Sequence, residues 1–485
     1  MKFSPVNLIM TLLLLQSCTS YHHKHSEHGH PATENSKKWL AGDHHIHSRF
    51  SVKWDSSTTP PTPITAGDAH YSASMIAQMA SHHGLDWMVI TDHGGPNHSK
   101  LNKEQAYPDL IASRKVNSNI LQFYGMEFDA PGAQHASLII PHTHDEADKL
   151  YKLENKYARK EAYPADPTRD TEDKMLEALK YMDAMESKPV IITNHPGRSV
   201  NKLGQYTAVT PTELRNWNDT APDVAIGMEG SPGHQARTLN KDGSLKPKEI
   251  RGSYRHYPTM GGFDPMTAQL GGFWDSMLAE GRNWWITSSS DSHVHYTENG
   301  IDFWPGEYSK TYVYSEKNYD KVLDNLRNGH IFVTTGDLIS ELNINVVSSA
   351  GLDVASIGDT LKVNQGDKVT VSVKFLDPET KNAHFDNPSV NRVDLIIGQV
   401  NDKLNDKSVD TNPSTIVAKR FTEKDWQQVG PYKEFSMTLK NLSQNSYIRV
   451  RGTNTNELEP EKDLPGSDPW SDLWFYSNPI FIDVH

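Results

Sequence analysis

Gly42-Asp43-His44-His45-Ile46-His47 is the stretch around which the fold of this chain can be worked out. In a β-strand, side chains two residues apart lie on one face, so His45 and His47 would project together, roughly 7 Å apart along the backbone. Asp43 shares that face. Neutral imidazoles placed in this way can bind one divalent metal ion. The stretch therefore predicts half of a metal site, whose other ligands must come from elsewhere in the chain.

Five later segments repeat one design, in which an apolar strand ends in ionisable or amide residues. Strands are predicted at 86–91, 121–126, 189–193, 223–228 and 283–287. The residues that follow them are Asp92 and His93, Glu127, Asn194 and His195, Glu229, and finally Asp291 and His293. Helices predicted at 71–83, 171–187 and 266–280 precede three of the strands. Such alternation indicates parallel βα units, and in α/β barrels the chemistry gathers at the carboxyl ends of the strands. Any one of these residues alone would more often be structural, but the whole set predicts a convergent metal site.

Composition limits the classes of function. The chain has 485 residues, 36% of them hydrophobic, which is ample for a folded core of two to four domains. A formal net charge of -13 argues against nucleic acid as a partner, although an anionic small molecule is not excluded if a metal dominates the local field. With one cysteine and 24 histidines, a metal site must use His, Asp and Glu, which suit zinc, manganese or iron.

The amino terminus resembles a bacterial lipoprotein signal. An apolar run from Leu8 to Leu15 is too short to span a bilayer and ends in Leu15-Gln16-Ser17-Cys18, which resembles a lipobox. The resemblance implies a signal peptide at 1–17, a lipid on Cys18 and, because residue 19 is Thr, sorting to the outer membrane of a Gram-negative cell envelope. The alternative is an ordinary secretory signal followed by a free cysteine. Residues 18–38 form a polar, His-rich segment that we expect to be a disordered tether, either gathering metal or serving only as a linker.

The motifs of the middle part resemble the PHP (polymerase and histidinol phosphatase) superfamily. They occur in the order that this superfamily uses and span residues 42–293: Asp43-His44-His45-Ile46-His47-Ser48, Thr91-Asp92-His93, Gly125-Met126-Glu127, His195-Pro196 and Ser290-Asp291-Ser292-His293. Leu326 to Thr335 and the closing Ser477-Asn478-Pro479-Ile480 resemble one branch, the metallohydrolases related to carbaryl hydrolase. The resemblance implies a distorted (βα)7 TIM-like barrel over residues 39–336, with two or three divalent metal ions in its mouth.

Carried over residue by residue, the resemblance implies that His45, His47, Glu127 and Asp291 hold a first metal. Glu127 would bridge to a second metal, completed by His135 and His195. Asp92 belongs to the second motif and joins the expected ligand set. His93 and His293 match ligands of a third metal, but Ser48 to Val52 supplies no His or Asp and Asp55 comes late, which favours two metals and makes His93 and His293 proton carriers or outer groups.

Other residues near the strand ends admit more than one role. Asp43 is not a ligand in the family pattern, and we expect it to orient an imidazole from behind. Arg198 would stabilise substrate charge through its planar fork, or else form a surface salt bridge. Glu229, His234 and His295 are candidates for lining the pocket, and a structural role is equally open for each.

Residues 337–485 show a different sequence pattern. Period-two alternation at 341–346, 368–374, 392–397, 435–439, 447–451 and 479–483 indicates short strands of an all-β, immunoglobulin-like sandwich. The expected role of this domain is support for the barrel. Carbohydrate binding by Trp426, Trp470 and Trp474 is an alternative to the packing of these rings in a core.

Together these features predict an exported, lipid-anchored, metal-dependent hydrolase acting on a small molecule by a hydroxide shared between two cations. Phosphoester bonds are the favoured target. Amide, carbamate or carboxylic ester bonds are the alternative that the closer branch suggests, and a non-catalytic metal-binding lipoprotein is the third. The oligomeric state is left open.

Overall fold

The computed structural model describes residues 36–485 except 203, 350, 352 and 441. The expected signal peptide, Cys18 and nearly all of the expected tether lie outside the described residues. Lys38, the last residue of the expected tether, is the first residue of a strand. Within the described part of the chain, no helix combines the length and the apolar character needed to cross a bilayer.

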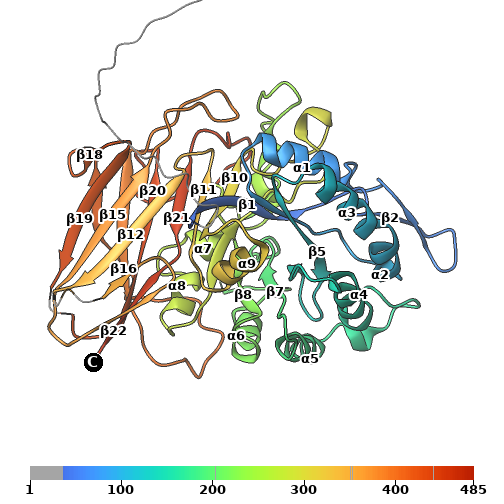
Figure 1. Ribbon diagram of the computed structural model, residues 1–485, viewed down its shortest axis with the longest axis horizontal. Helices are drawn as coiled ribbons and strands as arrows, with labels where there is room; N and C mark the ends of the chain where they lie inside the picture. The colour runs from blue at the N-terminus through green and yellow to red at the C-terminus, as the bar shows by residue number, and fades with distance from the viewer. Residues whose placement is uncertain (1–35, 203, 350, 352, 441) are drawn as a thin grey trace, which may run out of the picture.

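The protein is a mixed α/β structure with a large mixed sheet and a separate antiparallel β region (Figure 1). The large sheet has 15 strands. Its central path runs β11 (Ile331–Thr335), β10 (Ser309–Ser315), β1 (Lys38–Ile46), β4 (Trp87–Ile90), β5 (Leu121–Asp129), β6 (His135–Ile140), β7 (Val190–Thr193), β8 (Ala225–Ser231) and β9 (Trp285–Ser288). All five strands predicted to precede ionisable residues are present, within a few residues of the predicted bounds.

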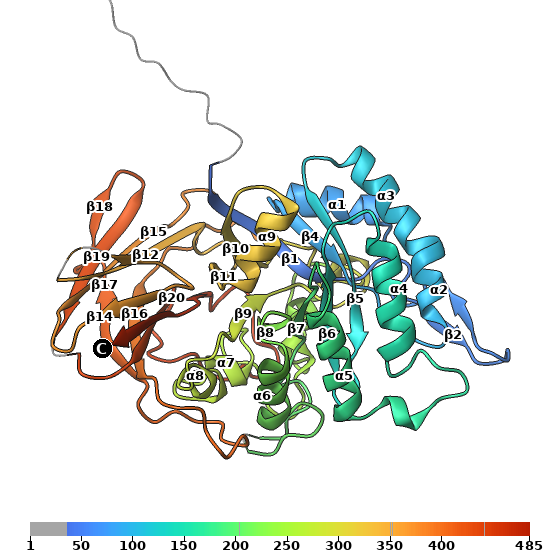
Figure 2. The same ribbon diagram turned by 60° about the horizontal axis from the view of Figure 1, so that its bottom comes forward.

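Helices lie along the outside of these central strands (Figure 2). They are α1 (Ala73–His82), α2 (His98–Leu101), a π-helical turn (Asn102–Ala106), α3 (Tyr107–Val116), α4 (Glu146–Tyr157), α5 (Glu172–Asp183), α6 (Pro211–Thr220), α7 (Pro265–Ala268), α8 (Phe273–Leu278) and α9 (Tyr319–Arg327). The helices predicted at 71–83 and 171–187 are confirmed as α1 and α5, capped by the side chains of Ser72 and Thr171.

The helix predicted at 266–280 is instead two short helices, α7 and α8. Gly271, between them, has φ +68°, and a Cβ on it would lie 2.8 Å from the carbonyl oxygen of Asn412. The left-handed conformation and this close approach interrupt the helical periodicity, so the prediction of one continuous helix was wrong.

The five strands predicted from the βα units are parallel to one another, and a sixth strand that was not predicted runs in the opposite direction. β1, β4 and β5 are parallel, as are β7, β8 and β9, but β6 is antiparallel to both β5 and β7. The link between β5 and β6 spans only residues 130–134, which is too short for a crossover helix and reverses the chain. As a result His135, the first residue of β6, pairs with Asp129 at the carboxyl end of β5.

β1 is tightly enclosed by its neighbours. It pairs with β10 on one side and β4 on the other, and its residues from Leu40 to Ile46 are buried. Gly42 packs directly on the Trp87 indole, since a Cβ on Gly42 would lie 1.9 Å from that ring. Beyond β1, the amide of His47 donates to the carbonyl of Ser292, 2.9 Å away, and Ile46 forms a parallel bridge with Ser292. The segment after β9 thus returns to the end of β1.

The C-terminal strands divide between two sheets. One set extends the large sheet beyond β11: β21 (Trp474–Ser477), β20 (Ser446–Thr453), β22 (Ile480–Val484), β14 (Thr360–Val363), β16 (Arg392–Gln399) and β17 (Ile416–Thr422). The other set forms the separate sheet: β13 (Val354–Ala355), β12 (Glu341–Ser348), β15 (Val369–Leu376), β19 (Tyr432–Leu439) and β18 (Gln427–Val429). The Phe421 ring on β17 stacks on Phe435 of β19 at 4.0 Å, which places apolar side chains between the sheets.

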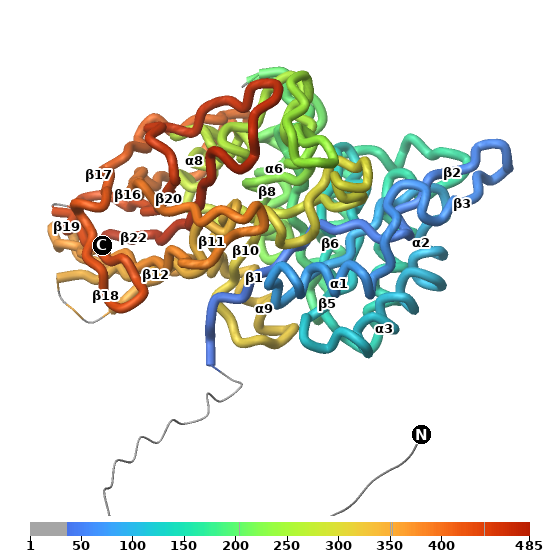
Figure 3. Tube along the Cα trace, turned by 90° about the horizontal axis from the view of Figure 1, so that it is seen from above, coloured from blue at the N-terminus to red at the C-terminus, as the bar shows by residue number. Residues whose placement is uncertain are grey.

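At the opposite end of the molecule, a small hairpin of β2 (Lys53–Asp55) and β3 (Thr62–Ile64) projects away from the C-terminal sheets (Figure 3). The six C-terminal strands predicted from alternation are confirmed as β12, β15, β16, β19, β20 and β22. Trp470 and Trp474 are buried, as expected for core packing. The barrel closure and the immunoglobulin-like topology stay predictions.

Asn478 joins the C-terminal region to the centre of the large sheet. Its Oδ1 accepts from the amide of Ile286 at 2.9 Å, and its Nδ2 donates to the carbonyl of the same residue at 3.0 Å. The side chain is fully buried and takes the place of a neighbouring strand for β9. The C-terminal Ser-Asn-Pro-Ile stretch therefore contributes to the central sheet itself.

We predict that Asn478→Ala lowers the free energy of unfolding by about 2–5 kcal/mol, because a buried N–H and a buried C=O of Ile286 both lose their partner. Urea unfolding followed by circular dichroism measures the change. Asn401→Ala, at an exposed position, is the matched control. Equal stability of the two variants would show that the Asn478 hydrogen bonds do not hold the regions together.

Candidate metal centre

His45 and His47 lie together at the carboxyl end of β1, as their spacing predicted. The Nε2 atoms of the two rings are 3.2 and 3.3 Å from Oδ1 of Asp291, and all three side chains are buried. β1 brings the two histidines, and the segment that follows β9 brings the aspartate. These three residues form one group in which the ligand atoms lie within 4.8 Å of one another.

Glu127, in β5, is at the centre of the cluster. Its two carboxylate oxygens contact imidazole nitrogens from five histidines: His45 Nε2 (3.2 Å), His47 Nε2 (3.6 Å), His93 Nδ1 (2.7 Å), His135 Nδ1 (3.1 Å) and His195 Nε2 (3.2 Å). Although burial opposes its ionisation, these histidines, His135 first, hold the pKa of Glu127 well below its usual value. A shared carboxylate of this kind can belong to two adjacent ion sites.

The reversal of β6 explains how His135 reaches this carboxylate. Because β6 begins at the edge where β5 and β7 end, His135 faces Glu127 although it starts a strand rather than ending one. His195 follows β7 in the left-handed region, with φ +31°, and its amide donates to Glu229. The two imidazole rings are 5.8 Å apart.

His93 and His293 approach each other on the outer side of the cluster. Their Nε2 atoms are 3.4 Å apart, and the His293 ring stacks on that of His47 at 3.8 Å. Asp68, which precedes α1, places Oδ2 3.8 Å from His93 Nε2 and 3.5 Å from His293 Nε2. Asp68 thus brings a carboxylate beside both histidines.

His234, one of the candidates for lining the pocket, does line it, and it contacts Asp302, which the sequence did not indicate. His234 Nε2 is 3.1 Å from Oδ2 of Asp291, and its Nδ1 is 2.5 Å from Oδ1 of Asp302. His234, His293 and Asp302 form another group with metal-ligand spacing. Among the described residues four such groups occur: His45-His47-Asp291, His47-His93-His293, His93-Glu127-His135 and His234-His293-Asp302.

Asp92, expected among the ligands, is placed outside these groups. Its Oδ1 accepts from the amide of Ser48 at 2.6 Å and its Oδ2 from the Ser48 hydroxyl at 2.7 Å. With both oxygens taken up in this way, Asp92 fixes the turn that follows His47. His295 is also turned away, since its Nε2 contacts Glu307 at 2.9 Å.

Buried carboxylates behind the cluster hold the histidines in place. Glu229 accepts from Nδ1 of His45 at 2.7 Å, which leaves the Nε2 of that ring free to face Asp291. Asp43 accepts from the amides of His45 (3.0 Å) and Ser290 (3.1 Å), so it orients two backbone segments rather than the expected imidazole.

Arg198 lies at the cluster and is not a surface salt bridge. Its Nη2 donates to Oδ2 of Asp291 at 3.0 Å, and its guanidinium lies 5.9 Å from the centre of the Tyr254 ring. Arg198 and the outer histidines line a pocket of about 780 Å³ that opens to solvent. Further lining residues include Lys53, His70, Gln134, Glu298 and Asn299.

The donor set fits metal ions. Two buried polar atoms that face the centre of the cluster, His47 Nε2 and Glu127 Oε2, make no hydrogen bond among the described residues. Nitrogen lone pairs and carboxylate oxygens that point at a common space are costly to bury without a cation between them. Imidazole and carboxylate donors suit zinc, manganese or iron.

Comparison with known proteins adds no identity: the chain matches no protein-family model, and a search of the curated proteins finds no match. The site has therefore to be interpreted from its own geometry.

We predict that Glu127→Gln removes most of the metal that the cluster binds, because the neutral amide loses the charge around which five imidazoles gather. Metal content per chain, measured by inductively coupled plasma mass spectrometry after dialysis, tests this. Glu104→Gln, at an exposed position, is the control. Because both variants keep the His-rich amino-terminal segment, its contribution cancels; unchanged metal content in Glu127→Gln would contradict a carboxylate-centred site.

Proposed function

We propose that this protein is a metal-dependent hydrolase of the PHP type and that its substrates are phosphoesters. The observation that carries the proposal is the buried Glu127 carboxylate, which lies between the His45 side and the His135–His195 side of a solvent-open pocket. This arrangement matches the ligand sets inferred from the sequence for two neighbouring ions. The Ile46–Ser292 bridge after β9 supports the proposed distorted seven-stranded barrel.

We assign each residue of the cluster either to metal binding or to holding a ligand in position. His45, His47, Glu127 and Asp291 would hold one ion, and Glu127, His135 and His195 a second. Divalent ions bound there supply Lewis acidity, lowering the pKa of water and polarising the oxygen of the bond to be cleaved. Glu229 fixes the tautomer of His45, Asp43 holds the backbone of His45 and Ser290, and Asp92 holds the backbone just after β1.

Cationic side chains at the pocket support an anionic substrate. Arg198 places a guanidinium beside Asp291, and Lys53 approaches from the β2–β3 hairpin. A planar guanidinium suits the paired oxygens of a phosphoryl group. The acidic residues Asp68 and Glu298 line the same pocket and favour the second candidate, amide, carbamate or carboxylic ester hydrolysis, in which the substrate carries less charge.

Binding of metal without catalysis is the third possibility, and the openness of the pocket argues against it. A purely structural site is closed by protein ligands, whereas a catalytic one leaves room for water and substrate. We further propose that the chain is exported and anchored in the cell envelope through Cys18. This localisation rests on the sequence alone.

A hydrolysis assay tests the proposed chemistry. We expect the metal-loaded protein to hydrolyse p-nitrophenyl phosphate or bis-p-nitrophenyl phosphate, to lose this activity with EDTA and to regain it with zinc or manganese. Arg198→Ala should lower kcat/KM for the phosphoester by about 10- to 100-fold, the loss expected for a hydrogen bond to a charged group, and lower that for p-nitrophenyl acetate much less. Arg198→Lys keeps the positive charge but loses the planar guanidinium, so its kcat/KM for the phosphoester should lie between those of the wild type and Arg198→Ala.

Turnover of only p-nitrophenyl acetate and an aryl carbamate would overturn the phosphoesterase proposal in favour of the second candidate. Full activity in His45→Ala would overturn the mechanism as a whole.

The number of ions depends on Asp68. With this carboxylate beside His93 and His293, the geometry supports a third ion in addition to the two favoured by the sequence. We predict that Asp68→Ala lowers the metal content by one ion per chain, while Asp55→Ala, in the neighbouring hairpin, leaves it unchanged. Equal metal content in both variants would support two ions, with His93 and His293 left as proton carriers.

A further inference from the structure

A polar trough crosses the exposed face of the five-stranded sheet, far from the metal centre. Two cavities, of about 570 and 500 Å³, share the lining residues Asn343, Asn345 and Lys374 and therefore adjoin each other. Trp39, at the first of these cavities, lies near the start of β1, whereas His45 is at its end. Six residues of strand separate them by roughly 20 Å at about 3.3 Å per residue.

The floor of the trough consists of two polar rows that follow the strand register. In the first row Asn343 of β12 pairs with Lys374 of β15, which pairs with Glu434 of β19. The second row is formed by Asn345, Ser372 and Ser436 on the same three strands. The intervening residues of these strands point into the core, so the two rows are a regular surface of alternating donors and acceptors.

One end of the trough is an aromatic wall. The rings of Trp39 and Tyr314 are 5.2 Å apart and tilted by 53°. Tyr314 is 38% exposed to solvent. On the other side Lys374 lies over the Tyr432 ring, 4.1 Å from its centre. Aromatic faces beside polar groups provide apolar contact for a ligand that also needs hydrogen bonds.

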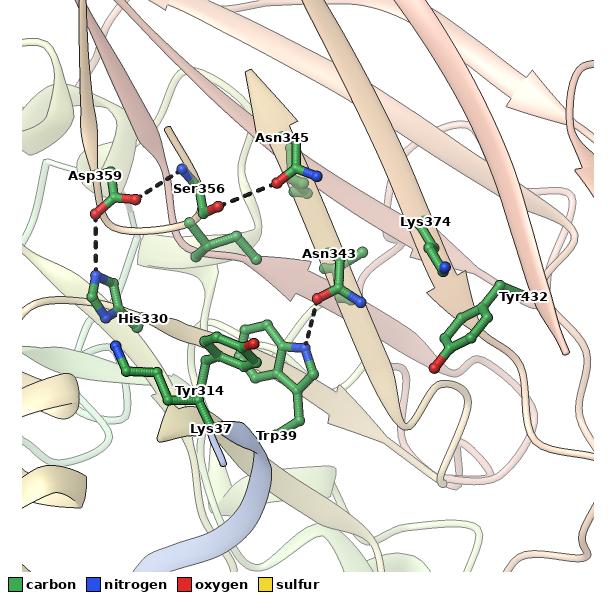
Figure 4. Close-up of a pocket in the computed structure, with 13 residues that line it drawn as sticks. Lys37, Trp39, Tyr314, His330, Asn343, Asn345, Ser356, Asp359, Lys374 and Tyr432 are labelled. Atoms are coloured by element: carbon green, nitrogen blue, oxygen red, sulfur yellow. Dashed lines mark hydrogen bonds and ion pairs between the residues drawn. The ribbon is translucent and has the colours of Figure 1, made fainter. Parts of the chain in front are cut away.

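The two asparagine amides are fixed in orientation and have unused donors. Trp39 Nε1 donates to Oδ1 of Asn343 at 3.3 Å, and the Ser356 hydroxyl donates to Oδ1 of Asn345 at 3.3 Å. Figure 4 shows that both amide nitrogens consequently turn towards the side of the cavity where Lys374 and Tyr432 lie. Neither nitrogen donates to an acceptor within the described part of the protein, so both are available to a ligand.

Charges along the trough are largely balanced. Lys374 is 3.2 Å from Glu434, and His330 is 3.3 Å from Asp359, next to which Lys37 also lines the cavity. Such pairs do not generate the one-sided field that recruits phosphate or a highly charged polymer. Hydroxyl groups, which both donate and accept, match this floor better than an anion does.

We propose that the trough binds a neutral oligosaccharide, whose hydroxyls would meet the two polar rows and whose apolar ring face would pack against Trp39 and Tyr314. The trough spans β12 to β18, three strand spacings or roughly 14 Å, which suits a short chain of sugars rather than one. This binding would keep the metal centre near a glycan surface. The proposal does not depend on the reaction that the metal centre performs.

Affinity electrophoresis of the full chain tests the proposal, with barley β-glucan, galactomannan or xylan in the gel as neutral probes and polygalacturonate or alginate as acidic ones. We expect at least one neutral polysaccharide to retard the protein. Asn343→Ala/Asn345→Ala should weaken this binding by about tenfold or more, since two hydrogen bonds are lost. Thr370→Ala/Thr438→Ala alters a hydrogen-bonded pair in the next row of the same face, which does not line either cavity, and should leave binding unchanged.

Binding should also persist in EDTA and in His45→Ala, which separates the trough from the metal centre. The proposal is overturned if no neutral polysaccharide retards the protein, if only acidic ones do, if the asparagine variant binds as well as the control, or if EDTA abolishes binding. Circular dichroism of the two double variants shows whether both are folded, and Tyr314→Ala, at a partly exposed position, gives a second disruption of the same wall.

Discussion

The crowding of five imidazoles around the Glu127 carboxylate is the interaction on which the arrangement of the central strands depends. The five histidines come from four strand termini, the ends of β1, β4 and β7 and the start of β6, so the contacts exist only if all of these termini meet at one edge. A buried carboxylate surrounded by nitrogen lone pairs is unfavourable unless cations or protons complete it. The fold therefore concentrates an electrostatic cost at one place, and metal binding would offset that cost.

Precise strand packing is what makes this concentration possible. Gly42 lets β1 approach the Trp87 ring without a side chain between them, which sets the register of β1 on β4 and hence the position of His45 and His47. On the other side, the short 130–134 link reverses β6 and delivers His135 to the same edge. A crossover helix at this point would have made β6 parallel and moved its first residue to the opposite edge.

Much of this could be predicted from the sequence, because strand periodicity is a local property. The alternation of His45 and His47, and the ionisable residues after β4, β5, β7 and β9, follow from where apolar runs stop. The single cluster that they form follows from the rule that parallel strands end at one edge. Asp92 was wrongly expected to be a metal ligand, because its side chain instead accepts hydrogen bonds from Ser48 and neither residue alone indicates that contact.

The residues that were missed belong to loops, whose course depends on tertiary contacts. Asp68 reaches His93 and His293 only because the segment after the β2–β3 hairpin folds back over the strand ends, where the amide of Ala69 bonds to the carbonyl of Ser51. His234 was named only as a pocket candidate, because its contacts with Asp291 and Asp302 depend on a left-handed backbone, with φ +59°, that no periodic pattern indicates. The strand β6 was not predicted, and apolar alternation alone would not have shown that it runs antiparallel to its neighbours.

The continuity of the large sheet bears on what the C-terminal region does. β21 pairs with β11, and the Asn478 side chain bonds to the backbone of β9, the strand that precedes Asp291. β9 ends three residues before that aspartate, so its position is set partly by a residue almost 200 positions later in the chain. A C-terminal region attached in this way is an integral support for one edge of the metal centre. A domain that served only as an appended binding module would have no need to place a buried side chain against this particular strand.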